Sequence, residues 1–170
     1  MIDWLDAAPR RVLAGVTAAG IAMLAFGLYL QHVVGLNPCP MCIVQRYALV
    51  GVVVVSALAA LGKGRGLWLA GSAMGVVLAL FGAFVAARQS WLQWYPPETV
   101  SCGRDFYGMI ATFPLERAIP MIFRGSGDCA AIDWTFLGGS IANWSFVAFV
   151  VIALVLLALL WRQGPGRRPA

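Results

Sequence analysis

Four long apolar runs constrain this chain more than any other feature of its sequence. They cover residues 12–30, 43–61, 67–87 and 141–161, and Arg46 is the only charged residue inside them. At about 1.5 Å of rise per residue, each run is long enough to cross roughly 30 Å of hydrocarbon as an α-helix. Only 11% of the 170 residues are charged, whereas soluble domains have about a quarter. We therefore expect an all-α integral membrane protein, folded as a four-transmembrane-helix bundle.

The segments between the runs complete the expected organisation. Short loops join the first three runs, and a long loop at about 88–140 precedes the fourth. Within it, residues 104–123 are apolar but broken by Pro114 and Pro120, so we expect a short surface helix on the membrane and no further span. Packing of this segment over the bundle remains an alternative. The sequence shows neither an internal repeat nor a second domain, and we expect a single domain over 1–170.

Basic residues near the ends of the runs predict the orientation in the membrane. Four crossings put both termini on the same side as the loop at 62–66. This side carries Arg10, Arg11, Lys63, Arg65, Arg162, Arg167 and Arg168. The positive-inside rule therefore predicts cytoplasmic termini, with the loops at about 31–42 and 88–140 on the opposite side. The net charge of +5 mostly reflects this bias, so we expect no nucleic-acid partner.

All four cysteines would then face a compartment that permits disulfides. Cys39 and Cys42 stand in the sequence PCPMC at the edge of the second run, where Pro40 fits the first turn of a helix. The free N–H groups of such a turn favour a thiolate. Arg46 lies one helical turn after Cys42, where its charge favours ionised sulfur or an electron-rich ring. We predict a thiol pair that opens and closes. An inert disulfide, a zinc half-site and an arginine that reaches the lipid headgroups remain alternatives.

A second pair of cysteines, Cys102 and Cys129, lies in the long loop. A static disulfide that stabilises the loop fits these residues as well as a catalytic one does. Two pairs, one of them beside the membrane, suggest an electron relay, because thiolate exchange moves a disulfide from one pair to another. The sequence contains no Rossmann glycine fingerprint and no haem-type histidine pair. A lipid-soluble quinone that reaches Cys42 from the bilayer is the acceptor that best fits this location.

Three stretches carry a family signature: QHVVGLNPCPMCIVQRYAL, QWYPP and SGDCAAIDWTFLG. Together with the four spans, they extend over about 13–161 and closely resemble the bacterial disulfide bond formation protein B (DsbB) family. The resemblance implies a protein-disulfide:quinone oxidoreductase of the bacterial inner membrane, with its cysteines in the periplasm. Such a protein reoxidises a periplasmic DsbA-like thioredoxin-fold partner and passes two electrons to ubiquinone or menaquinone.

The resemblance also implies a role for each cysteine. Cys102 looks like the thiol that forms a mixed disulfide with the partner, and Cys129 like its loop mate. Cys39 would exchange with the loop pair, and Cys42 would contact the quinone. Arg46 matches the quinone-associated arginine of the family.

One position departs from the family pattern. Where well-known members carry a histidine near the end of the third helix, this chain has Gln89. An amide donates a hydrogen bond to a quinone carbonyl but cannot act as a cationic acid near neutral pH. We expect Gln89 to belong to the quinone site, although its contact with the quinone stays open, and Arg88 beside it could compensate. Trp134 matches an aromatic position of the family.

Other functions fit parts of the sequence. The vitamin K epoxide reductase family shares the bundle and the quinone chemistry, but its loop cysteines precede the membrane-proximal pair, the reverse of the order here. A DsbB paralogue dedicated to one substrate remains possible. A small transporter would need an ionisable residue deep in a span, and the spans contain no Asp, Glu or Lys. A structural-disulfide protein would have cysteines that do not cycle. We predict no metal site, since the second close-spaced ligand pair of zinc sites is missing.

Overall fold

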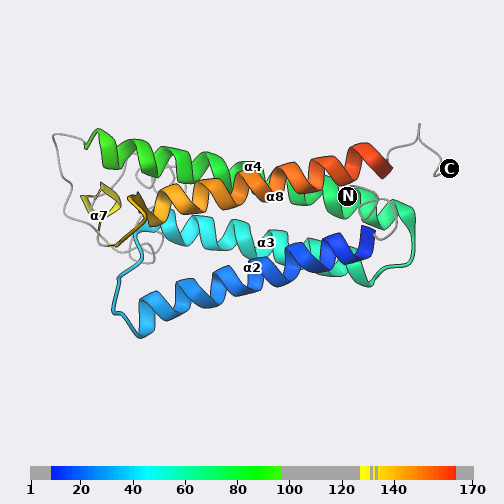
Figure 1. Cartoon of the computed structure of the whole chain (residues 1–170), viewed down its shortest axis with the longest axis horizontal. Coiled ribbons are helices and arrows are strands. Elements are labelled where there is room, and N and C mark those ends of the chain that lie inside the picture. The colour runs from blue at the N-terminus through cyan, green and yellow to red at the C-terminus, as the bar shows by residue number, and fades with distance from the viewer. Residues whose placement is uncertain (1–8, 97–126, 131, 133, 164–170) are drawn as a thin grey trace, which may run out of the picture.

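Four long helices dominate the structure (Figure 1), a computed structural model that describes residues 9–96, 127–130, 132 and 134–163. They are α2 (Pro9–His32), α3 (Pro40–Leu61), α4 (Arg65–Trp94) and α8 (Ile141–Gln163). Each is long and apolar enough to cross a membrane. The predicted four-helix membrane bundle is thus confirmed. The predicted surface helix at 104–123 lies outside the described residues.

Each helix contains its predicted span but continues beyond it. α3 begins at Pro40 and not at 43, and α4 continues to Trp94 and does not end at 87. Hydropathy reports the width of the apolar layer, whereas backbone hydrogen bonding continues through polar residues at the helix ends. Cys42 and Gln89, which the predicted loops at 31–42 and 88–140 included, therefore lie on helices.

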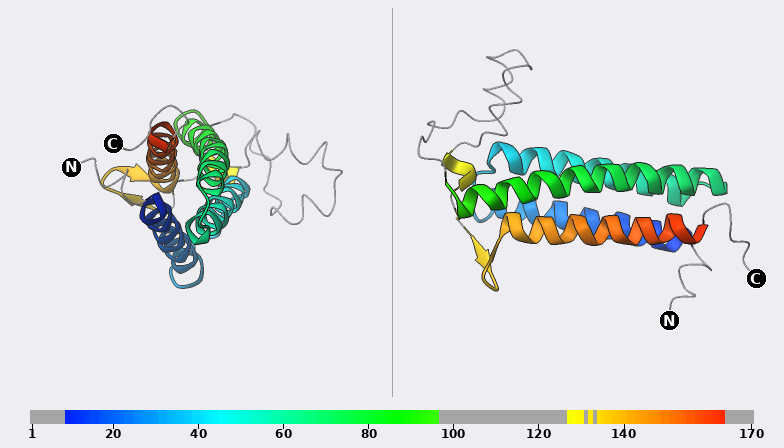
Figure 2. Two further views of the ribbon diagram at one scale, coloured as in Figure 1. Left: turned by 90° about the vertical axis from the view of Figure 1, so that its right-hand side faces the viewer. Right: turned by 90° about the horizontal axis from the view of Figure 1, so that it is seen from above.

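The helices form an arc in which α4 is central (Figure 2). α4 packs against both α3 and α8, and α2 packs against α3, whereas α2 has few contacts with α8. Glycines allow the close approach of α4 to its neighbours. A Cβ atom at Gly71 would lie 2.4 Å from the Cβ of Ala59 on α3, and one at Gly82 would lie 2.4 Å from the Phe149 ring on α8. These glycines therefore serve helix packing within the bundle.

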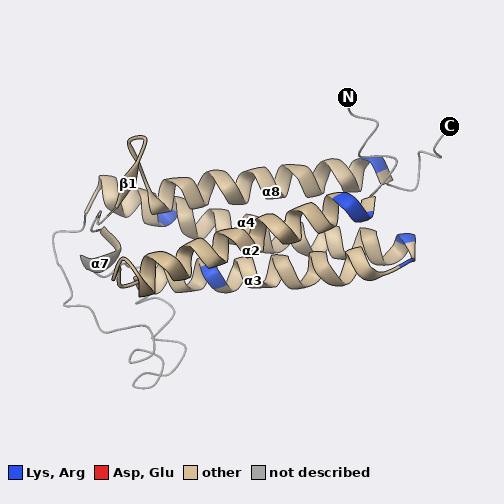
Figure 3. Cartoon of the chain, turned by 60° about the horizontal axis from the view of Figure 1, so that its bottom comes forward, with Lys and Arg blue, Asp and Glu red and all other residues tan. Residues whose placement is uncertain are grey.

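The two ends of the bundle differ in composition (Figure 3). One end holds the start of α2, the α3–α4 connection and the end of α8, and five of the described basic residues lie there: Arg10, Arg11, Lys63, Arg65 and Arg162. Arg10 donates to the carbonyl oxygen of Ala60, and Arg65 donates to that of Gln163. Because these carbonyls end α3 and α8, the arginines satisfy groups that the helices leave unpaired.

Two short elements lie at the other end, beside the cysteines. α7 (Gly127–Ala130) carries Cys129 and packs against α4 and α3. A hairpin of β1 (Thr135–Phe136) and β2 (Gly139–Ser140) leads directly into α8. Its turn includes Gly138 at φ 80°, in the left-handed region that favours glycine. This hairpin is not predicted from the sequence, because strands of two residues are too short to show an alternation of apolar and polar residues.

Candidate redox site

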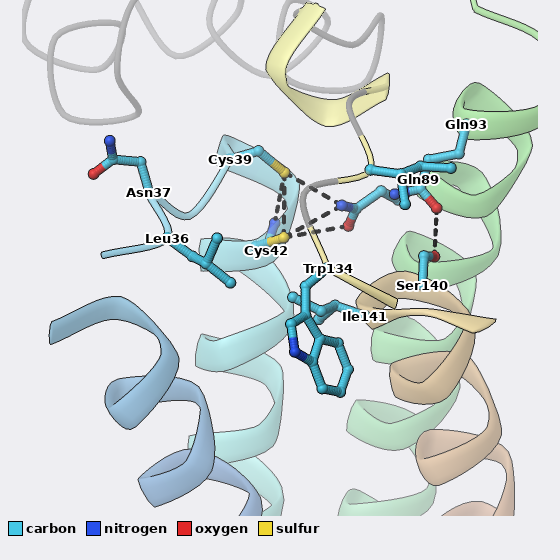
Figure 4. A pocket seen from close by; sticks show the side chains of 10 residues that line it. Leu36, Asn37, Cys39, Cys42, Gln89, Gln93, Trp134, Ser140 and Ile141 are labelled. Carbon is cyan, nitrogen blue, oxygen red and sulfur yellow. Dashed lines mark hydrogen bonds between the residues drawn. The ribbon is translucent and has the colours of Figure 1, made fainter. Parts of the chain in front are cut away.

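Cys39 and Cys42 lie at the start of α3, with their sulfur atoms side by side (Figure 4). Cys39 is the N-cap residue, and its sulfur accepts the backbone N–H of Cys42 at 3.4 Å. Pro40 occupies the first turn, as predicted, where its missing N–H loses no helical hydrogen bond. The two Sγ atoms of these free thiols are 3.3 Å apart. The backbone at this helix start therefore holds the two sulfurs close enough to form a disulfide with each other on oxidation.

Cys129 of α7 joins this pair from the long loop. Its side chain is fully buried in an apolar cluster. The other buried members of that cluster are Cys39, Met41, Val85 and Leu92. Hydrogen bonding with Cys129 and with Cys42, together with burial, raises the pKa of the Cys39 thiol. Three of the four predicted cysteines thus meet at one end of the bundle, and Cys102 lies outside the described residues. Within the described ranges, no group of three or more His, Cys, Asp or Glu side chains is arranged to hold a metal ion.

Gln89 of α4 lies against the thiol pair (Figure 4). Its Nε2 atom donates to Cys42 Sγ at 3.3 Å and to Cys39 Sγ at 3.4 Å. Its Oε1 atom accepts a hydrogen bond of 2.7 Å from Nε2 of Gln45, which lies one turn after Cys42 on α3. The hydrogen bonds of Gln89 therefore go to the sulfurs and to a second amide. Its contact with a quinone stays a prediction.

Gln45 was not predicted as part of the site. The residue lies three positions after Cys42 in the same helix, so its place on the cysteine side of α3 could have been read from the helical period. Its pairing with Gln89 could not, because that pairing depends on the register between α3 and α4. Both glutamines are buried, and buried amides without partners are costly. The pairing could therefore be inferred only from the burial of both glutamines on helices that pack against each other.

Arg46 lies one turn after Cys42 on α3, as expected, but its guanidinium is directed toward α2. It donates to Oε1 of Gln31 and, at 3.0 Å, to the carbonyl oxygen of Gly27. Its hydrogen bonds to the described part of the chain do not include Cys42. The interaction of Arg46 with a bound ring stays a prediction. Gln31 was not predicted as part of the site, although it is the first residue of the family stretch QHVVGLNPCPMCIVQRYAL.

A large apolar cavity lies between α2, α3 and α8. Its volume is about 790 Å³, and Cys42, Gln45 and Arg46 form part of its wall. Aromatic side chains form another part of the wall: Phe26 of α2, Trp134 just before β1, Phe136 of β1 and Trp144 of α8. Trp134 packs edge-on against Phe26, with ring centroids 6.0 Å apart. The cavity therefore combines an aromatic wall, one cation and one cysteine.

Cys42 also lines the smaller pocket that contains the thiol cluster. That pocket is drawn in Figure 4, and its wall includes Cys39, Cys42, Gln89 and Trp134. Cys42 and Trp134 thus face both spaces. Gln89 is part of the smaller pocket and not of the large cavity wall. Cys42 is the thiol that links the loop-facing cluster to the apolar cavity.

Comparison with known proteins assigns the chain to a family. Residues 9–159 match the family model described as "Disulfide bond formation protein DsbB". A protein named disulfide bond formation protein B from Paracidovorax citrulli (strain AAC00-1) is 75% identical, over 99% of this chain and 94% of the relative. A protein of the same name from Polaromonas sp. (strain JS666 / ATCC BAA-500) is 71% identical, over 98% of this chain and 99% of the relative. Another from Aromatoleum aromaticum (strain DSM 19018 / LMG 30748 / EbN1) is 49% identical, over 92% of this chain and 95% of the relative. The resemblance seen in the sequence is thus confirmed, and the chain belongs to the DsbB family of disulfide bond formation proteins.

Proposed function

We propose that this protein reoxidises a periplasmic DsbA-like thiol oxidase by disulfide exchange and passes the electrons to a membrane quinone. Membership of the DsbB family supports a general role in disulfide bond formation. The observation that carries the finer proposal is the position of Cys42, which lines both the thiol pocket and the apolar cavity. A cysteine in that position connects disulfide exchange at the membrane surface with an acceptor dissolved in lipid.

The loop half of the relay is supported by the contact between Cys129 and Cys39. In the proposed sequence, the partner's dithiol reduces a disulfide between Cys102 and Cys129, and the partner leaves as a disulfide. With Cys39 and Cys42 joined in a disulfide, Cys129 attacks Cys39 and Cys102 then resolves the mixed disulfide, so that the loop disulfide is restored and Cys39 and Cys42 become thiols. Each exchange transfers two electrons and two protons between pairs. Direct contact between the pairs is what this second exchange requires.

The cavity half is supported by the chemistry of the cavity wall. Apolar and aromatic side chains suit a ring and an isoprenoid tail, and a guanidinium suits a carbonyl oxygen that gains negative charge. A bound quinone, ubiquinone or menaquinone, would supply the oxidising capacity, taking two electrons and two protons as Cys39 and Cys42 close to a disulfide. Gln31 and Gly27 hold the guanidinium of Arg46 at the wall. The apolar lining keeps water away from the reacting sulfur.

The proposed orientation puts both termini in the cytoplasm of a bacterium and the cysteines in the periplasm, across the inner membrane. The charge distribution supports this orientation, because the basic residues gather at the end of the bundle opposite the cysteines (Figure 3). Among the described Lys and Arg side chains, Arg46 and Arg88 are the two nearer the cysteine end, and both lie on helices.

The test mixes the purified protein with a reduced DsbA-like partner and a short-chain ubiquinone, and follows quinone absorbance together with partner thiols. We expect oxidised quinone and partner thiols to be lost in equal stoichiometry, and Cys42→Ser to abolish this loss. Ser56→Ala is an equally small change about 20 Å along the same helix and should keep it. Quinone reduction that persists in Cys42→Ser, or partner oxidation without quinone reduction, would contradict the proposal. Turnover with a single partner among several would favour the substrate-dedicated paralogue.

A further inference from the structure

A buried pair of amides between α3 and α4 is not used by the relay described so far. We propose that Gln45 is a positioning residue: it fixes the amide of Gln89 with its N–H groups toward Cys39 and Cys42, and thereby keeps Cys42 reactive. This inference rests on the proposed function in one respect, that Cys42 reacts as a thiolate. It assigns a role to a residue outside the cysteine motif, whose amide is a polar group in the wall of the apolar cavity.

The orientation of Gln89 follows from the donor that Gln45 supplies. A glutamine amide can present either its oxygen or its nitrogen to a neighbour. Oε1 of Gln89 accepts a bond of 2.7 Å from Nε2 of Gln45, which can only donate. Nε2 of Gln89 therefore faces the sulfurs, at 3.3 Å from Cys42 and 3.4 Å from Cys39. If the Gln89 amide alone were reversed, its N–H groups would face those of Gln45 and its oxygen would face the sulfurs.

The sulfur of Cys42 collects two donors in this arrangement. It accepts from the thiol of Cys39 at 3.3 Å and from Nε2 of Gln89 at 3.3 Å. Its own contact with Oε1 of Gln89 is longer, at 3.6 Å. Donors directed at a sulfur favour its charged form over its neutral form. The orientation that Gln45 selects is thus the one that favours a thiolate at Cys42.

Burial makes these bonds effective. Gln45 is 6% exposed and Gln89 is 4% exposed, so water competes little for their hydrogen bonds, and each is stronger than it would be at a surface. The charged or titratable groups near the amide pair, among the described residues, include the thiols of Cys39, Cys42 and Cys129, the guanidinium that α3 directs toward α2, and Arg88, which precedes Gln89 on α4. An amide does not titrate, so its donation to sulfur persists across the neutral range.

The test measures the nucleophilicity of Cys42 directly, with neither partner nor quinone present. Its failure is therefore distinguishable from failure of the proposed relay. The fully reduced protein is alkylated with iodoacetamide, and modification of Cys42 is followed by site-resolved tandem mass spectrometry. The rate near neutral pH is divided by the rate at strongly alkaline pH, where every variant has a thiolate. This ratio cancels changes in access to the sulfur and reports the thiolate fraction.

Removal of the Gln45 donor should lower this ratio. We expect Gln45→Met, which nearly retains the shape of the side chain, to lower it about tenfold, as loss of a hydrogen bond to a charged group would. Gln89→Met should lower it equally, and the double variant should lower it no further, because both changes remove one interaction. An unchanged ratio in Gln45→Met, or a further fall in the double variant, would overturn the assigned role.

Two more variants separate positioning from packing. Gln45→Leu has a different shape and likewise lacks a donor, so it should give the same ratio as Gln45→Met; unequal ratios would attribute the effect to packing. Gln93→Met is the matched control, because Gln93 lies one turn further along α4 and lines the same small pocket but accepts its hydrogen bond from Ser140. Gln93→Met should keep the wild-type ratio, and a fall equal to that of Gln45→Met would refute the specific role of Gln45.

Discussion

Two kinds of helix–helix interface, here called seams, occur in the bundle. The seams that α4 makes with α3 and α8 are filled, whereas the seam between α2 and α8 encloses the large cavity. In the filled seams, an added Cβ at Gly75 would already lie 2.7 Å from Leu156 of α8. In the open seam, about 790 Å³ is lined by aromatic and aliphatic side chains, with Cys42 at its edge. Lipid tails are as apolar as these side chains, so close packing and not the hydrophobic effect holds the filled seams together. The packing of α4 against α3 and α8 thus stabilises the bundle, so that α2 and α8 need not pack closely against each other.

A polar link joins α2 to α3 at the edge of the cavity. α2 packs on α3 along its length, and Arg46 of α3 donates to two acceptors on α2 at the edge of the cavity. A charged side chain within a span is held where it has a function or a partner, because its desolvation is unfavourable. Arg46 has both in this arrangement: it joins α2 to α3 and lines the space where we propose that the quinone binds.

Overfilling a closed seam should have the largest effect on the protein. The Cβ of Gly82→Val would lie 2.4 Å from the ring of Phe149, which is itself buried, so the helices must separate. We expect a loss of about 3 kcal/mol in the free energy of unfolding, measured by denaturation in detergent micelles. Gly15→Val is the matched control, because an added Cβ at Gly15 meets nothing within 4 Å. Equal stability of the two variants would contradict the description of this seam.

Removal of the cation from the open seam should affect the reaction more than the fold. Arg46→Ala should slow quinone reduction about thirtyfold, because a charged hydrogen-bond donor at the cavity wall contributes about 2 kcal/mol. The measurement is quinone absorbance with the partner in excess. Arg10→Ala removes an arginine that also donates to a carbonyl oxygen, at the opposite end of the bundle, and should keep the wild-type rate. Unchanged quinone kinetics in Arg46→Ala would refute the role assigned to the arginine.

The difference between the seams also explains which parts of the structure the sequence predicts. Spans are predictable because hydropathy and length are local properties of each run. The position of Cys39 at a helix start is predictable because Pro40 follows it and restricts the backbone locally. The resemblance to the DsbB family rests on continuous motifs, and the comparisons confirm it. The roles of Cys102 and Cys129 in that resemblance remain predictions.

Contacts between helices are not predictable from such local patterns. The hydrogen bond from Gln45 to Gln89 depends on the register between α3 and α4. The contacts of Arg46 with Gln31 and Gly27 depend on the register between α2 and α3. A helical period tells which residues share a face, but not which face meets which helix. The sequence therefore predicts the chemistry of the cysteines and the arginine, whereas the amide pair and the open seam require the packed structure.

A bulky side chain in the open seam should block the reaction and leave the fold intact. Ala148 lines the cavity, and Ala148→Phe should raise the KM for quinone about tenfold, or about 1.4 kcal/mol. Its free energy of unfolding should stay within about 0.5 kcal/mol of the wild type. The same substitution at Ala153, which is 2% exposed in the packed core, should instead destabilise the fold. Ala148→Phe that unfolds as readily as Ala153→Phe would show that the cavity is not available space.

The smallest effect should come from loosening the link between α2 and α3 at the edge of the cavity. Gln31→Leu removes one acceptor of the Arg46 guanidinium but leaves the carbonyl of Gly27 at 3.0 Å. Because one anchor remains, we expect the KM for quinone to rise only about threefold, which corresponds to about 0.6 kcal/mol. If Gln31 acts through Arg46, the double variant with Arg46→Ala should behave as Arg46→Ala alone. Additive effects in steady-state kinetics would mean that Gln31 interacts with the quinone itself, and its bond with Arg46 would then contribute to α2 packing alone.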